Sequence, residues 1–284
     1  CSENLDDTRG ARERFAMLQS HAGESPDALD AGLRRCRLDI ELEDYQDLAT
    51  ASSLLRARRD LLPADRAEAT SYQALVALKS DDLAAAEREL RTALAAIEAR
   101  ADQGVPPQNA AAVHFAQGEL LRLRAQKLTF VPMPTDFTAT MEQRCQALLD
   151  AEDAYIDPIK TKDVRWAVRA GLRVSSLYRT LHDDLLLIPP PKSANTDARK
   201  ALFRGAMRLR YRILLEKGLG TLSHTLDLEK TAGARGSWLE QARAAKADME
   251  RQLVEERAEL AKLPYSEAEL QKAFDDLAAR PKTG

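Results

Sequence analysis

The residues best suited to catalysis or metal binding in this 284-residue sequence are its few histidines and its adjacent acidic residues. The four histidines are far apart. None belongs to a His-Glu-x-x-His zinc-binding motif, and none follows a glutamate by three residues as in a di-iron helix. His182 and Asp183 place two metal-ligating groups side by side, so a metal-dependent α-helical enzyme is one alternative. The four histidines are His21, His114, His182 and His224.

Sequence motifs for nucleotide binding and hydrolysis are missing. The chain has no Walker loop and no Gly-x-Ser-x-Gly segment, and Gly218-Leu219-Gly220 lacks the third glycine of a dinucleotide fingerprint. The chain has several pairs of adjacent aspartates. None has a further aspartate three residues on, which would place two carboxylates on one helix face to bind magnesium. We therefore predict a protein that is not an enzyme and that has no catalytic residue, resident metal or cofactor.

Arginines form the most concentrated charged feature of the sequence. Residues 165–217 hold twelve basic and four acidic side chains, a net charge of +8 within a chain of net charge −3. Two arginine triplets repeat at every fourth position, which aligns each along one side of a helix. They form either a solvated outer face or one basic wall that holds an acidic peptide, lipid anion or polysaccharide anion. The partner-binding candidates are Arg165, Arg169, Arg173, Arg204, Arg208 and Arg212.

Cys36 and Cys145 are separated by 109 positions. We expect two buried free thiols rather than a disulfide, since distant units of an elongated helical protein are seldom neighbours. Neither residue belongs to a Cys-x-x-Cys pair of the kind that binds zinc.

Composition favours an all-α protein. The chain is 44% hydrophobic, 31% charged and 5% aromatic, and Ala, Leu, Arg and Glu are frequent. Its near-neutral charge argues against general nucleic-acid binding, and no apolar run approaches the ~18 residues of a membrane-spanning helix.

Prolines and capping residues divide the chain into eleven predicted helices. Ser25-Pro26 is a typical helix start, and Ser237 with Glu240 and Ser266 with Glu269 match capping boxes. We expect the long segment 195–229 to break near Gly218. The predicted helices lie near 6–20, 26–41, 44–60, 64–79, 82–101, 107–128, 137–156, 161–187, 195–229, 237–262 and 266–280.

Residues 68–99 resemble a tetratricopeptide repeat. A turn at Ser80-Asp81-Asp82 precedes Leu83, Ala86, Leu90 and Ala93, and residues 45–55 repeat much of this spacing 38 positions earlier. The resemblance implies antiparallel helical hairpins stacked as a short solenoid, in which small residues let helices approach closely. Gly118 and Gly171 stand inside predicted helices and fit such close approaches. We expect an N-terminal segment over 1–24 and a repeat domain over 25–284, with a subdivision near 129–136 or 188–196.

The start Cys1-Ser2-Glu3-Asn4 resembles the mature end of a bacterial lipoprotein. The resemblance implies acylation at Cys1, which anchors the chain to the periplasmic face of the outer membrane. Together the two resemblances imply a non-catalytic scaffold or assembly factor that binds other envelope proteins. If Cys1 results from truncation, a cytoplasmic adaptor with the same helices is the alternative.

The lipoprotein prediction is tested by the intact mass of the product of the native gene, expressed in a bacterial host and recovered by membrane fractionation. We expect the mass to exceed that of the peptide by a diacylglyceryl group and one further acyl chain at Cys1. An unmodified soluble chain, or one extended upstream of Cys1, would favour the cytoplasmic adaptor.

Overall fold

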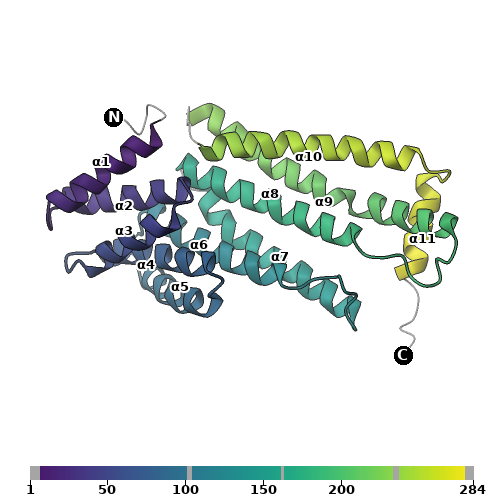
Figure 1. Cartoon of the computed structure of the whole chain (residues 1–284), viewed down its shortest axis with the longest axis horizontal. Helices are drawn as coiled ribbons and strands as arrows, with labels where there is room; N and C mark the ends of the chain where they lie inside the picture. The colour runs from purple at the N-terminus through teal and green to yellow at the C-terminus, as the bar shows by residue number, and fades with distance from the viewer. Residues whose placement is uncertain (1–6, 101–103, 161–162, 233–236, 279–284) are drawn as a thin grey trace.

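A computed structural model describes residues 7–100, 104–160, 163–232 and 237–278 (Figure 1). Within these ranges the chain forms eleven α-helices and no strand, which confirms the prediction of an all-α protein. The predicted helix ranges agree with the observed ones to within a few residues at most ends. The helices are α1 (Thr8–His21), α2 (Pro26–Glu41), α3 (Tyr45–Ala57), α4 (Pro63–Lys79), α5 (Leu83–Glu98), α6 (Pro107–Gln126), α7 (Phe137–Lys160), α8 (Val164–Leu186), α9 (Asp197–Ala232), α10 (Ser237–Ala261) and α11 (Glu267–Ala278).

Two of the three predicted helix starts have the expected caps. The Ser25 hydroxyl accepts the amide of Ala28 at 3.2 Å ahead of α2. Ser266 and Glu269 form a capping box, since the Ser266 amide donates to the Glu269 carboxylate at 2.7 Å and the Glu269 amide donates to the Ser266 hydroxyl at 3.3 Å. The capping-box prediction for Ser237 is wrong: its amide and hydroxyl donate to Glu41 of α2.

The turns α2–α3 and α4–α5 have the same geometry. Glu43 and Asp81, 38 positions apart, both adopt a left-handed backbone conformation, with φ of 55° and 57°. In each turn the next residue is an aspartate whose carboxylate accepts an amide three positions on, at 3.1 Å for Asp44 and 2.9 Å for Asp82. The repeat in the sequence therefore corresponds to a repeated helix-turn-helix geometry.

Neighbouring helices pack against one another along an elongated molecule (Figure 1). The short helices α1 to α5 occupy one end, the long helices α7 to α10 run toward the other, and α11 crosses that far end. One cluster of buried apolar side chains extends from α2 to α10. At its centre the Phe115 ring packs against the rings of Tyr155, Trp166 and Trp238, with centroids 5.3–6.5 Å apart. Among the described helices, none is both long and apolar enough to cross a membrane.

Helix α9 is continuous through Gly218, so the predicted break there is wrong. A Cβ atom on Gly218 would lie 2.7 Å from the Met249 side chain and 3.1 Å from the Ser175 carbonyl oxygen. The glycine therefore allows α9 to approach α8 and α10 closely while the helix stays intact.

Gly118 and Gly171 stand at the close approaches expected from the sequence. A Cβ atom on Gly118 would lie 2.6 Å from the Tyr155 ring, and one on Gly171 would lie 2.2 Å from the Thr225 hydroxyl oxygen. These contacts join α6 to α7 and α8 to α9. Both helix pairs can approach this closely only because the glycine has no side chain.

We predict that Gly118→Ala lowers the free energy of unfolding by about 1–2 kcal/mol, because overpacking outweighs the gain in helix propensity. Gly220→Ala in α9 is the matched control: its new Cβ would have no heavy atom within 4 Å. We expect it to raise stability by about 0.5–1 kcal/mol. Urea unfolding followed by circular dichroism measures both changes, and equal effects would contradict the packing role of Gly118.

Candidate functional site

Arg169, a member of the predicted basic face, is buried with 1% of its surface exposed. Its guanidinium lies between two tryptophan rings, 5.2 Å from the centroid of Trp166 and 5.1 Å from that of Trp238. It donates to the backbone carbonyl of Arg37 at 3.2 Å and lies 3.6 Å from the Glu41 carboxylate. Arg169 therefore joins α8 to α2 and α10 and does not belong to a solvated face.

Arg173, one turn further along α8, pairs with a second buried carboxylate. Its Nε lies 2.8 Å from Glu119 of α6, which also accepts hydrogen bonds from Arg122 at 2.8 Å and from the Tyr155 hydroxyl at 2.6 Å. Burial acts to raise the pKa of Glu119, but the two arginines outweigh it and hold the pKa below its usual range. Glu119 therefore stays ionised in the core.

The three arginines of α9 have different surroundings from those of α8. Arg204 is exposed, whereas Arg208 pairs with Glu256 of α10 at 2.7 Å. Arg212 lies 3.3 Å from Glu216 on its own helix. Two of these three positive charges are therefore neutralised by acidic side chains within the protein.

The two arginine triplets do not form one basic wall. Gly171 meets Thr225 and Gly218 meets Tyr178, so α8 and α9 run antiparallel. This pairing places Arg204, Arg208 and Arg212 beside the end of α8, roughly 25 Å along the helix from Arg169 at 1.5 Å per residue. Of the two alternatives for the triplets, the single basic wall is therefore wrong, because antiparallel packing places the triplets at different points along α8.

A mostly apolar cavity opens at the far end of the bundle, where the first turns of α7 and the stretch before it meet the stretch after α8, α9 and α11. Its volume is about 440 Å³. Three methionines and four aromatic rings contribute to its walls, and we call it the methionine cavity. Its lining residues are Met133, Phe137, Thr138, Met141, Glu142, Ile188, Pro189, Pro191, Phe203, Met207, Tyr211 and Phe274.

Apolar and basic side chains lie at or beside the mouth of the methionine cavity. Met133 in its lining is 49% exposed, and Leu187, directly before the lining residue Ile188, is 69% exposed. The exposed Arg210 holds its guanidinium 5.4 Å from the centroid of the Phe274 ring. The sequence analysis missed this site, although the methionines and the prolines around 132 and 189–191 were visible signals for it.

His182 and Asp183 bond to each other and to a neighbouring helix. The buried His182 places Nδ1 3.0 Å from the Asp183 carboxylate, which also accepts the amide of Gln252 in α10 at 2.8 Å. Within the described ranges, no group of three or more histidine, cysteine, aspartate or glutamate side chains could hold a metal ion.

Both described cysteines are free thiols, as expected, but only one is buried. Cys36 lies in the core, and burial raises its pKa well above the usual value, whereas Cys145 is exposed on α7. The expectation of two buried thiols is therefore wrong for Cys145. The predicted lipidation site, Cys1, lies outside the described residues.

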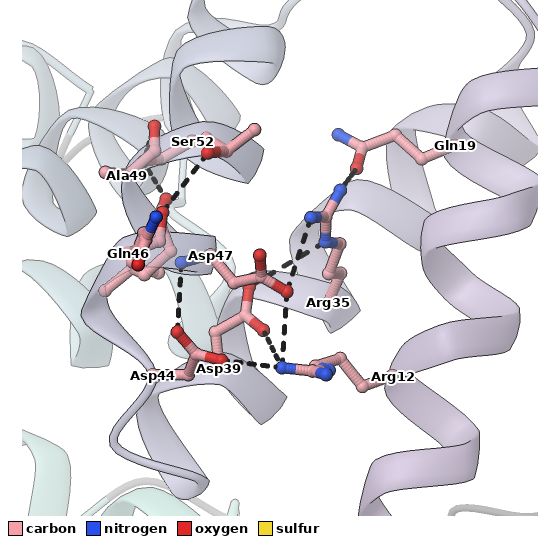
Figure 2. Close-up of polar contacts among 11 residues, drawn as sticks. Arg12, Gln19, Arg35, Asp39, Asp44, Gln46, Asp47, Ala49 and Ser52 are labelled. Atoms are coloured by element: carbon pink, nitrogen blue, oxygen red, sulfur yellow. Dashed lines mark hydrogen bonds and ion pairs between the residues drawn. The ribbon is translucent and has the colours of Figure 1, made fainter.

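Asp39 is the most unusual ionisable group of the N-terminal end (Figure 2). Its side chain is fully buried, and neither carboxylate oxygen has a hydrogen-bond partner among the described residues. Arg12 and Arg35 each stay 3.9 Å away, and the Arg12 guanidinium lies closer to Asp44 and Asp47, at 2.8 and 3.2 Å. Burial, with the charges of Asp47 and Asp44, raises the pKa of Asp39 to about 7 against the attraction of the two arginines.

Comparisons of this chain with protein-family models, with curated proteins and with solved structures found no match. Its function is therefore inferred from the described side chains.

The raised pKa of Asp39 predicts that the free energy of unfolding falls as the pH rises. The unfolded carboxyl ionises near pH 4 but the folded one near pH 7, so this group lowers the free energy of unfolding progressively between those values. We expect Asp39→Asn to unfold like the parent near pH 4 and to be more stable by about 1–4 kcal/mol at pH 8, at about 1.4 kcal/mol per pKa unit.

Urea unfolding at both pH values measures this difference. Asp30→Asn on the same helix is the control, because its carboxylate is 62% exposed and we expect little change. A loss of stability in Asp39→Asn at pH 8 would mean that attraction to Arg12 and Arg35 outweighs the cost of burial.

Proposed function

We propose that this chain is a non-catalytic scaffold of the bacterial envelope that holds an apolar segment of a partner protein in the methionine cavity. The observation that carries the proposal is an open apolar hollow of about 440 Å³ whose rim includes exposed apolar side chains. Exposure of apolar side chains to water costs free energy, and exposed apolar patches often mark the binding site of a partner that covers them.

The walls of the cavity suit a peptide segment. Its volume lies within the 300–1,000 Å³ range of ligand sites, which is enough for more than one apolar side chain. Met133, Met141 and Met207 have flexible, polarisable side chains that adapt to irregular apolar shapes. Apolar residues that recur along one face of a partner helix would fill this space.

The charges beside the cavity favour a partner with acidic flanks. Arg210 is exposed on α9, with its guanidinium 5.4 Å from the ring centroid of the lining residue Phe274. Arg204 is exposed on the same helix and is next in sequence to the lining residue Phe203. Acidic residues on either side of the bound apolar segment would meet these guanidiniums at the rim, where paired charges contribute to specificity and to the association rate. An acidic peptide is one of the three anionic ligands suggested by the arginine pattern, beside lipid and polysaccharide anions.

The remaining parts of the proposal come from the sequence. We propose that the helical hairpins belong to a short tetratricopeptide-like solenoid, supported by the repeated turn geometry at Glu43 and Asp81. We further propose attachment to the outer membrane through acylated Cys1, with the cavity in the periplasm. The same cavity would serve a cytoplasmic adaptor, and the intact mass distinguishes the two locations.

The scaffold function is tested with a photocrosslinking amino acid in place of Met133, at the rim of the cavity, in cells of the native host. We expect a discrete adduct with one envelope protein. Met141→Glu places a charge in the apolar cavity, and we expect it to reduce the adduct at least tenfold while the helical content stays unchanged.

Leu149→Glu is the matched control for this experiment. Leu149 lies on the same helix, is 49% exposed and does not line the cavity, so the added charge has no apolar wall to disturb. An adduct that both variants weaken equally, or the absence of an adduct with the parent chain, would contradict the proposal.

A further inference from the structure

A second, polar cleft lies where α2 meets the first turns of α6 and α8. It has a volume of about 250 Å³ and is separated from the methionine cavity by most of the length of α8. Four arginines and a single aspartate contribute to its lining, and we call it the arginine cleft. Its lining residues are Arg34, Arg37, Gln108, Asp163, Arg165, Trp166 and Arg169.

The inner wall of the arginine cleft carries a donor without an acceptor. Arg169 is 1% exposed, and its Nε has no hydrogen-bond partner among the described residues. Its Nη2 lies 3.6 Å from the Glu41 carboxylate, beyond hydrogen-bond distance. Burial lowers the pKa of Arg169, which shows that its surroundings compensate the positive charge only in part. An anion in the cleft would add negative charge beside this buried guanidinium.

A second guanidinium in the cleft is held in a fixed orientation. Arg37 pairs through Nε and Nη2 with both carboxylate oxygens of Glu68, at 2.9 and 3.0 Å. Glu68 is itself fully buried and accepts hydrogen bonds from Tyr72 and, at 2.7 Å, from Asn109. Because these contacts set the position of Arg37 in advance, a ligand would lose little free energy in ordering it.

Two helix N-termini also meet at the arginine cleft. Gln108 is the second residue of α6, whose N-cap, Pro106, makes no side-chain cap hydrogen bond. Arg165 is the second residue of α8. Asp163 caps α8, because its carboxylate accepts the Arg165 amide at 3.0 Å, so the uncapped end of α6 is the one whose dipole and first-turn amides add to the field of the arginines.

We propose that the arginine cleft binds a phosphoryl group, free or as a monoester. Side chains from α2, α6 and α8 approach the cleft from separate helices, which suits the several oxygens of a tetrahedral anion better than one planar carboxylate. This site is independent of the proposed protein-binding function.

Isothermal titration of the full chain at constant ionic strength tests the proposal, with inorganic phosphate and phenyl phosphate as the two probes. We expect saturable binding of at least one probe with a single site per chain. Arg165→Glu and Arg34→Glu should each weaken it at least tenfold. Arg91→Glu is the control of equal charge change: its side chain is 77% exposed on α5 outside the cleft, and we expect unchanged affinity.

Circular dichroism shows whether each variant is folded, and Arg165→Gln replaces Arg165→Glu if the latter is not. Tighter binding of phenyl phosphate than of inorganic phosphate identifies a monoester as the ligand class, and the reverse order identifies free phosphate. The proposal is overturned if neither probe saturates the chain, or if Arg91→Glu weakens binding as much as Arg165→Glu. It is also overturned if a tetra-aspartate peptide binds more tightly than both probes, because that result assigns the cleft to carboxylates.

Discussion

The position of Arg169 between two tryptophans is the interaction on which much of this structure depends. A buried guanidinium has lost its water, and the rings of Trp166 and Trp238, the Arg37 carbonyl and the Glu41 carboxylate replace that water only in part. Because these partners come from α2, α8 and α10, the three helices must keep their mutual positions to avoid exposing or isolating the charge. Removing one partner of such a group is costly, since the other charge stays buried.

Buried carboxylates repeat this arrangement along the molecule. Glu41, Glu68 and Glu119 each meet an arginine from a different helix, at 3.6, 2.9 and 2.8 Å. Apolar contacts are non-directional, so they restrict the rotation of one helix against another less than an ion pair does. A buried ion pair needs its two charged groups at a short distance and in a suitable orientation. We infer that these pairs specify which helix faces meet, while the apolar cluster from α2 to α10 provides most of the burial.

The two proposed sites lie at opposite ends of α8, and their chemistry is opposite too. The arginine cleft is lined by charged groups that the core already holds in place, whereas the methionine cavity is lined by adaptable apolar side chains beneath an exposed rim. Rigid donors suit a small anion of fixed shape, and adaptable walls suit a peptide segment. A scaffold with both would bind a small anion at one end and hold a protein segment at the other.

The sequence by itself determined the helices, because their signals are local. Ser25 with Pro26 and Ser266 with Glu269 act within one turn of chain, and the structure has the caps that they predict. Only the tertiary structure decided what the arginines do. The spacing of Arg165, Arg169 and Arg173 was correct for one side of a helix, but the packing of α8 against α2, α6 and α10 turned that side toward the core. Which face of a helix is buried depends on helices that are distant in the chain. No local spacing in the sequence relates the acidic residues of those helices to the arginines that they meet.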